Sequence, residues 1–413
     1  MKSYARKVIT NPLFSGSAIM VLGSNIANFF SYGYHFIVGR LLSPAEYGEL
    51  GALISFLGLL VTALSFLGLV IVKFVSSARD SELNGVFGWF QSIGIKFGIA
   101  VSLLVIVLSP FISSFLHIDL PEILILSPIF LVATANFVYK SFLQGQLKFH
   151  KVVISTNFEI ISKLLLSVVV ILLGYSVFGA ISAFLFAGLL NFLLLRRYVS
   201  VFRVGKIKHV FSKHREVFVY TVPIFIASFF SYALISLDVI LVKHYFPSEE
   251  AGTYTVLSTL GRIIFFAVAP ISSVMFPIIS KRNASGKGYR SIFKLSMIMS
   301  SVVILGILVL YKFLPFLVVG VLYGSNRYLD AYGLLPWTGL FIGFYTLASQ
   351  IISYYLSLGT TKIVILVPIT LFAQVIGIIL YHDTLFSVIL VSIVVTAAFL
   401  ATALGRLVYD RQI

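Results

Sequence analysis

The sequence has 413 residues and not one cysteine. Disulfide frameworks, thiolate metal sites and cysteine nucleophiles are therefore excluded. The glycine-rich loop that holds ATP phosphates, the HExxH zinc motif and the GxSxG nucleophile motif are also missing. We accordingly expect no enzymatic activity, with no catalytic residue, no metal site and no cofactor, and we exclude ATP-driven pumps and metalloenzymes.

Charge is scarce as well. Charged residues make up 11% of the chain, whereas an ordinary soluble domain contains about a quarter. Apolar residues make up 59%, and the mean hydropathy is +1.06. A water-soluble fold of this length would need far more charge to cover its surface. The composition therefore predicts an all-α polytopic membrane protein.

Apolar stretches of about 20 residues, the length at which a helix crosses a bilayer, can be cut at twelve places. The N-terminal stretch is too long for a secretory signal and has no cleavage site, so we interpret it as a retained first helix. The predicted spans are 14–38, 46–72, 86–110, 122–146, 152–173, 176–195, 217–242, 252–279, 291–312, 331–357, 362–381 and 384–405.

Acidic residues number only 14 against 30 Lys and Arg, which gives a net charge of +16. With the N-terminus in the cytoplasm, 21 basic residues fall in the inside segments and four outside, whereas four acidic residues fall inside and eight outside. Because the basic bias of short loops sets orientation, both termini are predicted to be cytoplasmic in the plasma membrane. We interpret the excess of basic residues as a signal of membrane topology, with anionic lipid headgroups as neighbours, and not as a sign of nucleic-acid binding.

The chain repeats itself. The sequence NFFSYGYHFIVGRLLSPAEYG at 28–48 recurs as SFFSYALISLDVILVKHYFPSEEAG at 228–252. Residues 29–32 match 229–232 at an offset of 200, and 46–48 match 250–252 at 204. An even number of spans separates the copies, which predicts two parallel six-helix bundles around a central cavity. The alternative is chance similarity between apolar segments.

The repeat predicts three parts. Residues 1–195 form an N-terminal bundle, 196–216 a basic cytoplasmic linker, and 217–413 a C-terminal bundle. Within the linker, apolar residues at 204, 207, 210 and 211 recur at helical spacing. This pattern suits either a helix lying in the cytoplasmic interface or an ordinary positively charged linker.

Ionisable side chains at membrane depth are costly and usually face a water-filled cavity or a partner. Arg262 lies about ten residues into the eighth predicted span. Together with Thr255, Ser258 and Thr259 it forms a polar stripe at helical spacing. We interpret Arg262, Ser258 and Thr259 as cavity-lining, substrate-binding residues, with a structural pairing role as the alternative for Arg262.

Three further charges lie in the third and fifth predicted spans. Lys96 lies in a GxxxG segment that permits close helix approach, and it is a candidate substrate contact or a structural residue. Glu159 and Lys163 are four residues apart and can neutralise each other. If Lys96 pairs with Glu159 instead, Lys163 is left for a substrate. Lys140 is expected to reach lipid phosphates.

Asp238, near the outer end of the seventh predicted span, is a candidate coupling carboxylate that Lys243 or Arg40 can balance. The first predicted span adds an uncharged polar stripe, interpreted as a cavity wall, with helix-to-helix hydrogen bonding as the alternative. The stripe consists of Asn25, Asn28, Tyr32 and His35.

The segment GRLLSPAEYGELG at 39–51, followed by LGLVIVKFVSSARD at 67–80, resembles the first two helices of polysaccharide flippases. These belong to the multidrug, oligosaccharidyl-lipid and polysaccharide exporter superfamily. The resemblance implies movement of an undecaprenyl-diphosphate-linked oligosaccharide to the outer leaflet by alternating access. It further implies that Arg40 and Arg262 face the diphosphate, and that a polysaccharide polymerase and glycosyltransferases are partners.

The chain departs from two related groups. It lacks the two extra C-terminal helices typical of lipid II flippases. Drug exporters of the superfamily carry acidic cation sites in the N-terminal half, where this chain offers mainly Glu159 beside Lys163. A cation-coupled exporter of small molecules and a membrane-embedded transferase or polymerase remain the alternatives.

Overall fold

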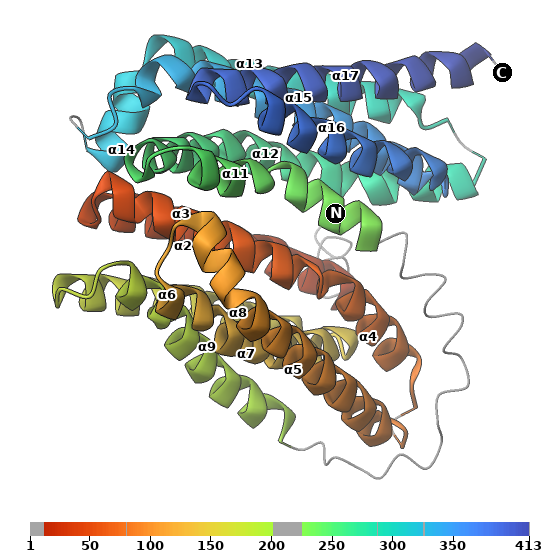
Figure 1. Cartoon of the computed structure of the whole chain (residues 1–413). Helices are drawn as coiled ribbons and strands as arrows, with labels where there is room; N and C mark the ends of the chain where they lie inside the picture. The colour runs from red at the N-terminus through yellow and green to blue at the C-terminus, as the bar shows by residue number, and fades with distance from the viewer. Residues whose placement is uncertain (1–11, 80, 201–224, 287, 325–326, 413) are drawn as a thin grey trace. The chain divides into compact units, whose positions relative to one another are not determined.

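The computed structural model describes residues 12–79, 81–200, 225–286, 288–324 and 327–412 (Figure 1). All regular secondary structure within these ranges is helical. Contacts divide the chain into two compact units. Unit 1 lies within Met1–Leu42 and Leu60–Phe225, and unit 2 comprises Ser43–Leu59 and Ile226–Ile413.

Unit 1 is a bundle in which α7 and α8 are the central helices. Helix α8 packs against α2 and α9, while α7 packs against α4, α5 and α9. The helices of this unit are α2 (Pro12–Leu41), α4 (Ser65–Ser77), α5 (Leu83–Leu116), α6 (Leu120–Leu124), α7 (Leu126–Gly145), α8 (Phe149–Leu172) and α9 (Val177–Val199).

The GxxxG segment of α5 brings that helix close to α7. A Cβ atom on Gly94 would lie 2.6 Å from Val138, and one on Gly98 would lie 3.0 Å from Leu131. Both glycines are buried. The close approach that the spacing predicted is therefore confirmed, and the glycines serve helix packing.

Unit 2 contains most of α3 together with the second half of the chain. Its elements are α3 (Pro44–Thr62), the helical segment Phe225–Leu234, α11 (Leu237–Tyr245), α12 (Ser248–Ala284), α13 (Arg290–Phe313), a π-helix (Phe316–Gly320), α14 (Val321–Tyr323), α15 (Ala331–Ser357), a 3₁₀ helix (Lys362–Ile365), α16 (Leu366–Leu380) and α17 (Leu385–Gln412).

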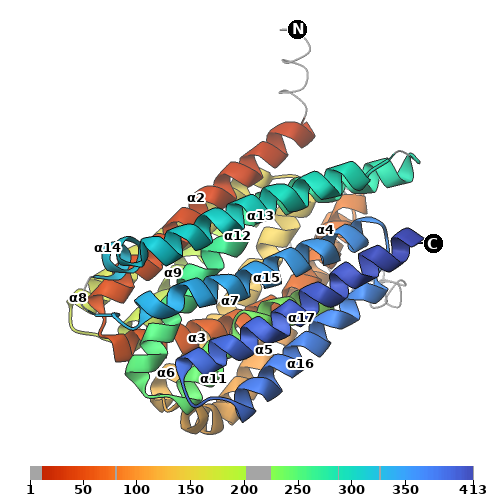
Figure 2. The same cartoon turned by 90° about the horizontal axis from the view of Figure 1, so that it is seen from above.

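Helix α15 is the centre of unit 2 and packs against α12, α13 and α17; these four helices run alongside one another in Figure 2. Small residues allow these approaches, since a Cβ atom on Gly343 would lie 2.9 Å from Ile304 of α13. The Tyr311 hydroxyl donates a hydrogen bond to the Leu260 carbonyl at 2.7 Å and joins α13 to α12.

The start of α3 is held in unit 2 by a glycine contact. A Cβ atom on Gly48 would lie 2.6 Å from the backbone nitrogen of Gly252, and one on Gly252 would overlap the Pro44 carbonyl. Helices α3 and α12 begin 204 residues apart, which is the offset of this part of the sequence repeat. Gly48 and Gly252 are thus matched positions of the two copies that touch each other.

Two polar contacts secure the same part of α3. The hydroxyls of Tyr47 and Tyr323 are 3.3 Å apart, and both rings are buried. The Lys243 Nζ atom lies 3.5 Å from Glu49 Oε1 and donates to the Ser248 hydroxyl at 2.6 Å. The side chains that cover α3 in unit 2 are therefore matched in size and charge.

Most predicted spans agree closely with helices, and α15 has the predicted bounds of 331–357. The second predicted span, 46–72, is instead divided into α3 and α4. Ten helices in the described ranges are long and apolar enough to cross a membrane, or eleven if the bent pair Phe225–Leu234 and Leu237–Tyr245 is one span. The first predicted span corresponds to α2, which is not among these ten helices. The number of twelve spans is therefore not confirmed.

Two predictions fall on residues outside the described ranges. They are the helix at 204–211 in the basic linker and the basic N-terminal residues Lys2, Arg6 and Lys7. The three-part division at 195 and 216 stays a prediction, since the contact-based units assign Ser43–Leu59 to the second unit.

Candidate functional sites

A half-buried ionic network joins three helices of unit 1. Lys140 of α7 donates to Glu159 Oε2 of α8 at 2.7 Å, and the Asn191 amide of α9 donates to the same oxygen at 2.7 Å. The Asn191 carbonyl oxygen accepts a hydrogen bond from Ser155 at 2.7 Å. Lys140 therefore does not reach lipid phosphates as expected, because a carboxylate on the neighbouring helix binds it first.

Lys163, the other expected partner of Glu159, lies between two aromatic rings. Its Nζ atom is 4.5 Å from the ring centroid of Phe184 and 5.2 Å from that of Tyr34. These are cation–π distances. In the described part of unit 1, no carboxylate oxygen lies within 4 Å of this ammonium. The Lys163 ammonium therefore lies against ring faces, with Glu159 within its electrostatic reach.

Lys96 lies on an exposed face of α5, the same face that carries Ile95, Ile99 and Leu103. Large exposed apolar side chains on a spanning helix are typical of a lipid-facing surface. The structure does not bring Lys96 to Glu159, whose carboxylate is bound by Lys140 and Asn191.

The polar stripe of the first helix lies away from its packing face. Helix α2 packs on α8 through Gly23, where a Cβ atom would overlap Val153, and the Asn157 amide donates to the Gly23 carbonyl at 3.1 Å. The members of the stripe are instead exposed or half-buried, and Arg40 at the end of α2 is exposed. The four members of the stripe are Asn25, Asn28, Tyr32 and His35.

Arg262 contacts the point where the seventh predicted span breaks. The segments Phe225–Leu234 and Leu237–Tyr245 meet at 41°, and the break leaves backbone carbonyls without helical donors. Arg262 is half-buried and donates from Nη2 to the Ile235 carbonyl at 2.6 Å. Its Nε atom is buried without a hydrogen-bond partner. A neutral acceptor therefore positions the guanidinium, and the buried Asp238 carboxylate lies within its electrostatic reach.

Asp238 lies directly after the break and is 1% exposed. One carboxylate oxygen accepts from the Val239 amide at 2.9 Å, and the other accepts from the Tyr254 hydroxyl at 2.9 Å. Lys243, one of its two expected partners, makes its ion pair with Glu49 instead. Asp238 therefore joins α11 to α12.

The remaining members of the α12 stripe are buried in unit 2 rather than open to a cavity. Thr255, Ser258 and Thr259 are all at most 5% exposed. Thr255 contacts Gly51 of α3, and Thr259 interacts with the hydroxyls of Tyr47 and Tyr323. Of this stripe, Arg262 has the greatest exposure.

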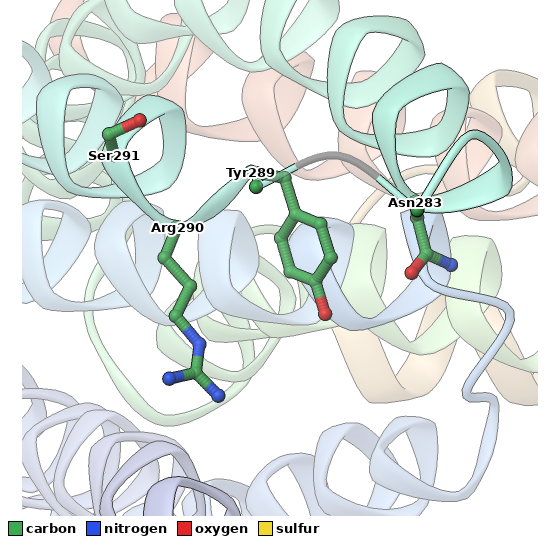
Figure 3. Close-up of a pocket in the computed structure, with 6 residues that line it drawn as sticks. Asn283, Tyr289, Arg290 and Ser291 are labelled. Carbon is green, nitrogen blue, oxygen red and sulfur yellow. The ribbon is translucent and has the colours of Figure 1, made fainter.

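Sequence reasoning missed two features. The Lys140 partner lies on another helix at a separation of 19 residues, which no local spacing reveals. A basic pocket of about 400 Å³ also opens between α12 and α13, where Arg290 and Tyr289 extend beside Asn283 (Figure 3). In the described residues, no three His, Asp or Glu side chains are grouped so that they could hold a metal ion.

The model of a family described as polysaccharide biosynthesis proteins matches residues 37–331. No curated protein sequence matches the chain. Three solved structures illustrate the fold. An inward-facing multidrug resistance MATE transporter of the MOP superfamily is 13% identical with a TM-score of 0.75, covering 95% of this chain and 99% of that one.

The second is the lipid II flippase MurJ in an inward closed conformation, 18% identical with a TM-score of 0.74, which covers 94% of this chain and 87% of that one. The third is the eukaryotic MATE transporter AtDTX14, 15% identical with a TM-score of 0.61, which covers 95% and 94%. At these identities the likeness concerns the fold, which is that of the MOP superfamily.

Proposed function

Because the chain belongs to the polysaccharide biosynthesis protein family, we propose that it is a flippase for an undecaprenyl-diphosphate-linked oligosaccharide. It moves this lipid from the inner to the outer leaflet of the cytoplasmic membrane. Membership places the chain among membrane transporters rather than enzymes. The family name points to a carbohydrate cargo, and MurJ, a lipid II flippase, has the same fold.

The observation that carries the proposal is the state of Arg262. A diphosphate cannot cross about 30 Å of hydrocarbon unaided, because removing an ion from water costs tens of kcal/mol on a Born estimate. A guanidinium at membrane depth replaces part of the lost hydration if no carboxylate neutralises it. In the described residues no carboxylate oxygen lies within 4 Å of Arg262, whose bonded partner is the Ile235 carbonyl; the Asp238 carboxylate acts on it at longer range.

Unit 1 contributes further candidates. The Lys163 ammonium lies against the rings of Phe184 and Tyr34, and we propose that it is a second cation for the substrate. The half-exposed stripe of α2 offers hydrogen bonds to sugar hydroxyls. The other proposed substrate contacts are Arg40, Lys96, Ser258 and Thr259. Among all these candidates, the surroundings of Arg262 and Lys163 favour these two residues most.

Alternating access would move the headgroup while its polyprenyl tail stays in lipid. An inside-negative potential favours outward movement of negative charge by about 2.3 kcal/mol per charge per 100 mV. Proton or sodium coupling is the other candidate driving force, for which Glu159 and Asp238 are the membrane-depth carboxylates.

The second candidate function is a cation-coupled exporter of small molecules, favoured by the likeness to MATE transporters. A cation site of this kind needs a carboxylate without a basic partner. Glu159 is bound by Lys140 at 2.7 Å, and Asp238 accepts from the Tyr254 hydroxyl and interacts electrostatically with Arg262, which leaves both carboxylates poor sites for a mobile cation. The flippase is therefore the better-supported function.

The test replaces Arg262 in proteoliposomes and follows a fluorescent polyprenyl-diphosphate oligosaccharide between leaflets. Arg262→Ala should abolish flipping while membrane insertion and thermal stability persist. Arg262→Gln retains a donor for the Ile235 carbonyl without charge and should also be inactive, whereas Arg262→Lys should keep part of the activity. Full activity of the Ala or Gln variant would reject the role of this charge.

A further inference from the structure

The second half of the chain contains a long stretch without any negative charge. No Asp or Glu occurs from residue 251 to residue 329. The turn between α12 and α13, in the middle of this stretch, exposes Lys281, Arg282, Arg290 and Lys294. Because no acidic neighbour in the sequence offsets these charges, the turn attracts anions.

The turn encloses a pocket of about 400 Å³, lined by Asn283, Gly286, Gly288, Tyr289, Arg290 and Ser291. The side chains of Asn283, Tyr289 and Arg290 extend to the same side of the backbone (Figure 3). Hydroxyl, amide and guanidinium groups all donate hydrogen bonds, so this lining suits an acceptor-rich anion.

Described residues on both sides of the pocket make contacts with their neighbours. Gly286 adopts a left-handed conformation at φ +63°, and Arg282 Nη1 donates to the Gly288 carbonyl at 3.0 Å. The Tyr289 ring lies 6.2 Å from that of Tyr354 on α15. Arg282 thus shapes the turn, while Arg290 makes no bond with the described residues and remains available to a ligand.

The length of α13 places this pocket at the depth of lipid phosphates. Arg290 and Lys312 lie 22 residues apart on one continuous helix, a rise of roughly 33 Å. The hydrocarbon core of a bilayer is about 30 Å thick. If α13 crosses the bilayer, the two basic residues lie at its two headgroup levels, where Tyr289 is also favoured.

We propose that this pocket binds the phosphate of an anionic membrane phospholipid. At headgroup depth such phosphates surround the turn at high local concentration. The Arg290 guanidinium can bind two phosphate oxygens at once, and Asn283 and Tyr289 can donate to the remaining polar atoms of the headgroup. The proposal concerns a resident lipid and does not depend on the identity of the transported substrate.

The test uses the full-length protein in nanodiscs that contain phosphatidylcholine and phosphatidylglycerol, with retained lipids weighed by native mass spectrometry. The wild type should retain phosphatidylglycerol preferentially. Arg290→Ala should reduce this retention about tenfold, the effect of about 1.5 kcal/mol for a lost charge-assisted hydrogen bond. Arg290→Lys should keep most of it. Thermal unfolding in pure phosphatidylcholine verifies that each variant is folded.

Lys294→Ala is the matched control, because it removes one positive charge from the same end of the same helix without lining the pocket. Equal losses in both variants would indicate general surface attraction and overturn the pocket. Unchanged retention by folded Arg290→Ala would do the same. Two further experiments add polyprenyl diphosphate or free inorganic phosphate to the nanodiscs. If the protein binds either compound in preference to phosphatidylglycerol, or if either displaces the bound phosphatidylglycerol, the phospholipid is not the ligand.

Discussion

Side chains that carry charge at membrane depth are stabilised here by partners on other helices. Glu159 is bound from α7 and α9, Arg262 by a carbonyl at a helix break, and Lys163 by two ring faces. Each arrangement lowers the cost of a buried charge in a different way. The carboxylate is paired with an ammonium group, whereas the hydrogen-bond and ring contacts of the two cations are with neutral groups.

Replacement of Glu159 by Ala should destabilise unit 1, because it leaves Lys140 and the Asn191 amide without their acceptor. Both side chains of the pair are partly accessible, so we expect a loss of about 2 kcal/mol, below the 3–5 kcal/mol of fully buried pairs. Thermal unfolding in detergent measures it. The double variant Lys140→Met/Glu159→Met should recover much of the lost stability. A double variant that is less stable than either single variant would contradict the pairing.

The sequence identified Glu159, Lys163 and Arg262 as candidate functional residues, because charge at membrane depth is rare. It could not identify their partners. Spacing along one helix favours the pair at four residues, whereas the pair that forms depends on how α7 packs, including its link to α9 through the Asn136 amide and the Gly188 carbonyl. The role of the Ile235 carbonyl could not be predicted from the sequence, because every residue has a backbone carbonyl.

Helix α3 is fixed in unit 2 by contacts that leave no room for a side chain at Gly252. Gly252→Ala should prevent this docking, because the added Cβ atom overlaps the Pro44 backbone, which cannot move like a flexible side chain. We expect a loss of about 3 kcal/mol, the upper end for overpacking, seen as a lower unfolding temperature or a loss of folded protein.

Gly306→Ala in α13 is the matched control, since nothing lies within 4 Å of the added Cβ atom. It should be neutral or slightly stabilising, because alanine favours the helix. If Gly252→Ala unfolds at the same temperature as Gly306→Ala, the docking of α3 does not rest on this contact.

The positions of the helices were largely predictable because long apolar stretches end at polar or glycine-rich turns, as at both ends of α15. Two elements were not predicted. The break at 235–236 follows Tyr232, Ala233 and Leu234, which carry no helix-breaking residue, so it depends on tertiary contacts with Arg262 and Tyr254. The π-helix Phe316–Gly320, which follows Pro315, lies between the predicted spans 291–312 and 331–357, where the sequence predicts a loop.

The whole chain lacks cysteine, so single introduced thiols can report its orientation. Cysteine at Asp383, predicted outside, should react with an impermeant maleimide in intact cells. Cysteine at Ser285, predicted inside, should react only after permeabilisation. Both positions are exposed. The reverse labelling pattern would refute the cytoplasmic assignment of the termini.

The assignment of Ser43–Leu59 to the second unit affects any attempt to express the protein as two fragments. A cut within the basic linker would leave this segment on one polypeptide, while Gly252, Tyr323 and Lys243 would be on the other. The C-terminal fragment alone would then expose a groove shaped for a helix it does not encode. Co-produced fragments should recover a folded protein only by reassembling in the membrane, and neither should be fully stable when made alone.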